Sequence, residues 1–102
     1  MNKDDNCKVC PEGQTDYSGM CLPEVDFTTF VYSLFTTAML HLGEIVDPET
    51  GRTSIQLPLA KHTIDTLAML EEKTKGNLDC EETRKLADFL GHLRLLYVRK
   101  NG

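Results

Sequence analysis

The sequence predicts an all-α fold, a small bundle of three amphipathic helices that follows an irregular N-terminal arm. Three stretches repeat apolar residues at the spacing of one helix face, and glycines follow the first two. Residues 1–24 show no such period and contain prolines, glycines and three cysteines. We therefore divide the 102-residue chain into a cysteine-bearing arm over residues 1–24 and a helical core domain over residues 25–102.

The first helix is predicted over residues 27–42, between Asp26 as N-cap and Gly43. Its apolar stripe consists of Phe27, Phe30, Val31, Leu34, Phe35, Ala38 and Leu42. The opposite face carries no charged residue, whereas a solvent-facing helix normally shows charged side chains there. We expect this face to contact a second subunit or another protein; the alternative is a central helix covered by its own neighbours. The candidate interface residues are Thr29, Tyr32, Ser33, Thr36, Met39 and Leu40.

Residues 47–51, DPETG, have the composition of a turn, and two further helices are predicted after it. The second helix is predicted from Pro58 to about Lys75, because proline suits a first helical turn and Gly76 follows. The third begins after a capping box of Asp79 and Glu82 and runs to about Val98. Their core faces are predicted to contain Leu59, Ala60, Thr63, Ile64, Leu67 and Leu70, and Leu86, Phe89, Leu90, Leu93, Leu96 and Tyr97.

Charge and hydropathy limit the classes of partner. The formal net charge of −5 argues against nucleic acid and against an anionic membrane surface, since both favour a basic protein. The longest uncharged stretch, residues 27–40, is too short to span a bilayer. The first ten residues lack the apolar region of a secretory leader. We expect a cytoplasmic protein.

The cysteines are the main candidates for chemistry. Cys7 and Cys10 have the spacing with which two thiolates hold one zinc ion, and Cys21 can supply a third ligand. The fourth ligand would come from Cys80, a histidine or a carboxylate, because a second Cys-x2-Cys pair is missing. A redox pair lacks its usual βαβ context, and a reducing cytosol disfavours structural disulfides. We expect free thiols on a loose arm, with a zinc clip as the alternative.

The remaining candidates for catalysis are weak. Cys80 stands at the first position of the third helix, where we expect a substitute for proline rather than a nucleophile. His41 with Glu44, and His62 with Asp65, pair an imidazole with a carboxylate, but we expect neither pair to bind metal. Phosphate loops, dinucleotide turns and Ser-His-Asp arrangements are absent from the sequence. We expect a protein that is not an enzyme.

Residues 22–98 resemble a bacterial family catalogued as domain of unknown function 1844. The shared stretches are PEVDF, HLGE, DPETG, LPLAKHTID, LAMLEEKTKGNL and LRLLYV. The resemblance implies a small, mostly helical, cytoplasmic bacterial protein and implies no reaction. Family members tend to carry a longer charged tail before this core and a Thr-Pro start to the last helix, where this chain has Asp79-Cys80. The cysteines are therefore a feature of this chain's branch of the family, and the resemblance implies nothing about their role.

Together these observations favour a non-enzymatic interaction or oligomerising module, most simply a homodimer formed through the first helix. The alternative is a small zinc-binding module whose Cys7, Cys10 and Cys21 clip orders the N-terminal arm. No cofactor other than zinc is expected.

Overall fold

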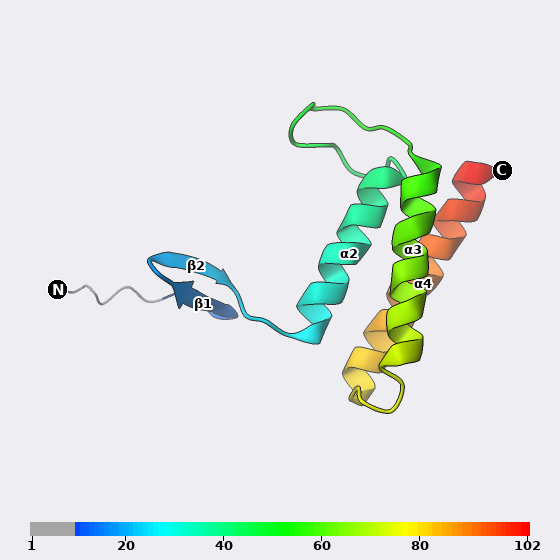
Figure 1. Ribbon diagram of the computed structural model, residues 1–102. Helices are drawn as coiled ribbons and strands as arrows, with labels where there is room; N and C mark the ends of the chain where they lie inside the picture. Colours follow the sequence, from blue (N-terminus) through cyan, green and yellow to red (C-terminus); the bar gives the residue numbers. More distant parts are fainter. Residues whose placement is uncertain (1–9) are drawn as a thin grey trace.

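The computed structural model describes residues 10–102 and places three packed helices beside a small N-terminal hairpin (Figure 1). The helices are α2 (Phe27–His41), α3 (Leu57–Lys73) and α4 (Cys80–Asn101). The hairpin pairs β1 (Gln14–Tyr17) with β2 (Met20–Pro23) in antiparallel register. α2 and α4 run in the same direction, with α3 antiparallel to both (Figure 1). The predicted fold class, a bundle of three helices, is confirmed.

The predicted N-caps Asp26 and Asp79 begin α2 and α4. The Asp26 carboxylate accepts the Thr29 N–H at 2.7 Å, a bond that lowers the pKa of Asp26. Asp79 and Glu82 form the capping box, because each carboxylate accepts the other residue's backbone N–H, at 2.8 and 3.0 Å. α3 ends at Lys73 rather than Lys75, and α4 continues to Asn101 instead of ending near Val98.

Gly43 ends the first helix in the left-handed region, at φ 79°. A Cβ at this position would lie 2.8 Å from the Ile55 Cγ1 atom, so the close approach of the loop also requires glycine. Two short backbone hydrogen bonds stabilise the loop between α2 and α3. The Gly51 N–H donates to the Asp47 carbonyl and the Gln56 N–H to the His41 carbonyl, both at 2.7 Å. This confirms the turn predicted at residues 47–51.

The core lies between the three helices and draws on all of them. Among the described residues, the buried apolar side chains are Val31, Ala38, Leu42, Ala60, Ile64, Leu67, Leu86, Leu90, Leu93 and Leu96. Thr63 is also buried, and its hydroxyl donates to the Leu59 carbonyl at 3.1 Å. Phe30 was predicted to join this core but is 51% exposed, because it lies about 100° around the helix from the buried Val31.

The prediction of an irregular arm is wrong for residues 14–23, where the hairpin forms. Ser18 and Gly19 connect the strands with φ values of 53° and 91°, the two positive angles of a type I′ turn. The Asp16 carboxylate accepts the Gly19 N–H at 2.9 Å and fixes this turn. Among the helices in the described part of the chain, none has the length and apolar character needed to cross a membrane.

Candidate interaction surface

The side of α2 that faces away from α3 and α4 is an exposed, uncharged surface. Of the predicted interface residues, Thr29, Tyr32 and Ser33 are exposed, and Thr36, Met39 and Leu40 are half-buried. Met39 packs partly against the core and contributes less to this side, whereas the exposed Phe30 adds to it. We call this surface the α2 outer face and define it by Thr29, Phe30, Tyr32, Ser33, Thr36, Thr37 and Leu40.

Three hydroxyl groups of the α2 outer face already have hydrogen-bond acceptors within the helix. Ser33 donates to the Phe30 carbonyl at 2.7 Å, Thr36 to the Tyr32 carbonyl and Thr37 to the Ser33 carbonyl, both at 3.0 Å. Such bonds to the preceding turn satisfy the hydroxyl donor without water. Removing these three side chains from water therefore leaves none of their hydroxyl donors unpaired, which lowers the cost of covering this part of the face.

Aromatic rings extend the α2 outer face across the seam between α2 and α4. Phe35 stacks on Phe89 with ring centroids 4.6 Å apart, and Tyr32 lies 6.0 Å from each of these rings. The His92 ring is 5.8 Å from that of Phe35. These separations suit offset and tilted aromatic pairs, which fix the orientation of Tyr32. Half-exposed aromatic side chains held in this way are typical of protein interfaces.

Charge is confined to the ends of this surface. α2 contains no Asp, Glu, Lys or Arg, and beyond its last turn Glu44 forms an ion pair with Lys100 at 2.9 Å. The hydrogen bond from Lys100 lowers the pKa of Glu44 from its usual value of 4.5. The pair joins the loop after α2 to the last turn of α4.

The cysteines differ from the free thiols that we expected, because Cys10 and Cys21 form a disulfide with Cα atoms 5.5 Å apart. The Gln14 N–H donates to the Pro11 carbonyl at 3.1 Å, and this turn brings Cys10 back beside β2. Cys80 is a free, exposed thiol at the first position of α4. Cys7 lies outside the described residues. Within residues 10–102, no three His, Cys, Asp or Glu side chains are grouped to hold a metal ion.

The hairpin was not predicted, although the sequence contains a signal for it. Ser18-Gly19 separates two four-residue runs, QTDY and MCLP, and such a dipeptide between short strands is a hairpin signal. Residues 14–17 paired with residues 20–23 would have placed Cys21 opposite Asp16. The pairing of Cys21 with Cys10 could not be predicted from the strand register, because Cys10 lies before β1 and has no position in the ladder.

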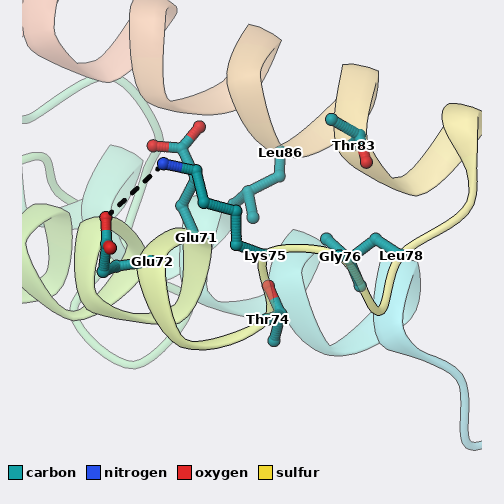
Figure 2. A pocket seen from close by; sticks show the side chains of 8 residues that line it. All are labelled: Glu71, Glu72, Thr74, Lys75, Gly76, Leu78, Thr83 and Leu86. Carbon is teal, nitrogen blue, oxygen red and sulfur yellow. Dashed lines mark ion pairs between the residues drawn. The ribbon is translucent and has the colours of Figure 1, made fainter.

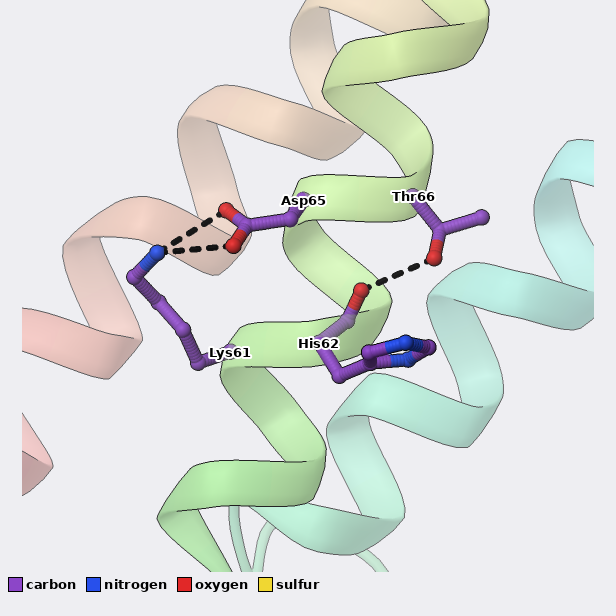
Figure 3. A network of polar contacts seen from close by, with 4 residues as sticks. All are labelled: Lys61, His62, Asp65 and Thr66. Carbon is purple, nitrogen blue, oxygen red and sulfur yellow. Dashed lines mark hydrogen bonds and ion pairs between the residues drawn. The ribbon is translucent and has the colours of Figure 1, made fainter.

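The two histidine and carboxylate pairs do not assemble into sites. Lys61 binds Asp65 at 2.8 and 3.0 Å, an interaction that raises the pKa of Lys61, while the His62 ring points toward α2 (Figure 3). His62 and Asp65 therefore diverge on α3. Glu44 is bound to Lys100 rather than directed at His41.

A pocket of about 340 Å³ lies at the turn between α3 and α4 (Figure 2). Leu78 and Leu86 supply its apolar side chains, and Lys75 and Glu72 form a long ion pair of 3.9 Å on side chains that are mostly exposed. Its eight lining residues include neither histidine nor cysteine. The arrangement gives no reason to assign catalysis to this pocket.

Comparison with known proteins identifies a family but no function. One family model, described as a domain of unknown function (DUF1844), matches residues 24–99. No curated protein and no solved structure matches the chain. The matched region begins after β2 and covers α2, α3 and all but the last two residues of α4, so the disulfide-bonded hairpin precedes it. The chain therefore belongs to the DUF1844 family.

Proposed function

We propose that this chain is a non-enzymatic interaction protein that forms a homodimer through the α2 outer face. The observation that carries the proposal is an exposed helix face without charge, on which three hydroxyl donors are satisfied inside the helix. A face with these properties is less costly to remove from water than an ordinary solvated helix face.

A second copy is the partner that the charge distribution favours. The chain carries a net charge of −5, so two copies repel each other wherever acidic faces approach. In a two-fold dimer both copies contribute the same surfaces to the interface, so these surfaces should carry no excess of one charge. The α2 outer face meets this condition, while α3 and α4 carry charged side chains on their exposed sides.

Charge introduced into the α2 outer face tests the proposal. In the variant Thr29→Lys, Ser33→Lys, Thr36→Lys, each dimer would bring six ammonium groups together, and we expect sedimentation to show a monomer. Lysine favours helix more than threonine or serine, so the bundle should stay folded by circular dichroism. A dimer that persists in this variant would contradict the proposal.

The matched control adds three lysines outside the α2 outer face, as Thr53→Lys, Ser54→Lys, Asn77→Lys. These exposed positions lie in the two loops between helices, and the change in net charge is the same. We expect the control to remain a dimer. Dissociation of both variants would indicate a general effect of charge rather than loss of a specific face.

A second candidate function, zinc binding, is favoured by the meeting of Cys10 and Cys21. When reduced, these two side chains would offer two thiolates at one point, and Cys7 precedes Cys10 by the spacing of a zinc knuckle. Native mass spectrometry of protein purified anaerobically without chelator tests this. About one zinc per chain is expected, lost in Cys7→Ser and retained in Cys80→Ser. A metal-free spectrum with reduced thiols contradicts zinc binding.

A further inference from the structure

The hairpin has two different faces. Side chains alternate along a strand, so Thr15, Tyr17, Met20 and Leu22 share one face, and Asp16 and Cys21 lie on the other. The disulfide places Cys10 beside the second face. Tyr17 is 44% exposed, Met20 62% and Leu22 39%, and we call these three the hairpin apolar face. Within the described residues 10–102, each of these three side chains keeps more than a third of its area exposed.

A short link joins the hairpin to α2 of its own chain. The Glu24 N–H donates to the Gly13 carbonyl at 3.0 Å, which attaches Glu24 to the hairpin, and Asp26 caps α2. Val25 is therefore the single residue between the last hairpin bond and the helix cap, and it is 90% exposed. The hairpin stands beyond the N-terminal end of α2, away from α3 and α4 (Figure 1). This short link limits how far the hairpin can fold back over α2 of its own chain.

A two-stranded hairpin needs such a covering surface. In water an isolated hairpin is marginally stable, and packing against a helix is one of the arrangements that stabilises it. The disulfide restricts the unfolded hairpin but leaves the hairpin apolar face in contact with water. The α2 outer face is an exposed, uncharged surface, and the hairpin of the same chain lies beyond the N-terminal end of α2 rather than over this face (Figure 1).

We infer that the hairpin apolar face of one copy docks on the α2 outer face of a second copy, which makes the dimer an exchange of N-terminal arms. This inference rests on the proposed function, because it assumes a dimer that uses the α2 outer face. It assigns Tyr17, Met20 and Leu22 as the groups that contact the partner's α2. Both faces are uncharged, so the contact adds no repulsion between two acidic chains.

The available area is sufficient for a specific interface. Six exposed apolar residues contribute from each copy: Tyr17, Met20, Leu22, Val25, Phe30 and Tyr32. A half-exposed side chain of this kind offers roughly 100 Å². Two copies can then remove about 1,200 Å² from water, the lower end of the range for specific protein interfaces.

The first test replaces the hairpin apolar face with a polar one, as Tyr17→Thr, Met20→Thr, Leu22→Thr. Threonine keeps the β propensity of these positions, and the hydrogen exchange of the β1 and β2 amides reports whether the hairpin still forms. We expect the dimer dissociation constant to rise at least tenfold, while the bundle melts at the same temperature when both chains are diluted to monomers. An unchanged dissociation constant would contradict the exchange of N-terminal arms but not the dimer through the α2 outer face.

The control removes comparable exposed apolar area elsewhere, as Met69→Gln, Leu95→Gln, Val98→Gln on α3 and α4. These side chains are 48%, 59% and 67% exposed. An unchanged dissociation constant is expected, since neither proposed face includes them. Dissociation of the control alone would place the interface on α3 and α4, and would overturn both the inference and the proposed function.

The second test uses the unaltered chain, so it does not depend on the folding of a variant. A dimer mixed from 13C-labelled and unlabelled copies allows contacts between copies to be separated from contacts within one copy. We expect nuclear Overhauser effects between the Met20 methyl group of one copy and the methyl groups of Thr29 or Thr36 of the other. A dimer in which such effects join only residues of the same copy contradicts the exchange.

Discussion

The helical bundle and the N-terminal hairpin are stabilised in different ways. The bundle buries ten apolar residues from its helices and their edges, whereas no described side chain of residues 10–26 is buried. The hairpin depends instead on its ladder, its turn and the bond between Cys10 and Cys21. The difference shows that one short chain can combine a self-sufficient core with an element that is completed by a covalent bond and, as we propose, by a partner.

The largest expected effect is the loss of a leucine from the bundle. Leu93 is fully buried at the centre of α4, and Leu93→Ala should lower the free energy of unfolding by about 2–5 kcal/mol. Urea denaturation followed by circular dichroism measures this change. The exposed Leu95 is the control, and Leu95→Ala should cost less than about 1 kcal/mol. Equal costs at the two positions would contradict the assignment of the core.

Removal of the disulfide should break the hairpin and spare the bundle. A cross-link that closes a loop of about 15 residues is worth roughly 3 kcal/mol, and the Cys10–Cys21 loop is of similar length. In Cys10→Ser, Cys21→Ser we expect the amides of β1 and β2 to lose protection from hydrogen exchange in the monomer. The melting temperature of the bundle should not change, nor should Cys80→Ser affect either region. Melting of the bundle together with the hairpin would show that the two regions are coupled.

Loss of a helix cap should have a smaller effect on the bundle alone. Asp79→Ala removes the acceptor for the Glu82 N–H and should cost about 1 kcal/mol. The exposed Asp88 lies within the same helix, so Asp88→Ala should change stability by less than about 0.5 kcal/mol. Thermal unfolding compares the two variants, and a larger cost at Asp88 would argue against the capping box as a determinant of α4.

The smallest expected effect concerns pH. The hydrogen bond from Lys100 lowers the pKa of Glu44 below 4.5, so Glu44 binds a proton less readily in the folded chain than in the unfolded chain. Its contribution to stability is present above pH 4.5 and is lost as the pH falls through the folded pKa. Glu44→Gln should therefore lower the melting temperature slightly near neutral pH, and this difference from the unaltered chain should shrink as the pH falls below 4.5. A difference that grows on acidification would contradict this sign.

The sequence predicts the helices well because their signals are local. Asp26, the Asp79 and Glu82 pair, and Gly43 each act within one turn of their own position. The disulfide was not predictable, because the pairing of Cys10 with Cys21 depends on a turn and a hairpin that must both form first. The assumption of a reducing compartment also argued against a disulfide.

The candidate surface was only partly predictable for a related reason. The absence of charge on the first helix is a property of the sequence, and it located the exposed Thr29, Tyr32 and Ser33. The orientation of Met39 toward the core and of Phe30 toward solvent depends on how α3 and α4 pack against α2. The bonds from Ser33, Thr36 and Thr37 to their own helix depend on side-chain rotamers.

The most direct test of the central claim is the number of subunits in solution. Sedimentation equilibrium of the oxidised 102-residue chain at micromolar concentration measures it without a variant or a label. We predict a mass of twice the 11.5 kDa chain, in reversible exchange with monomer on dilution. A stable monomer throughout this range would contradict both the homodimer and the exchange of N-terminal arms.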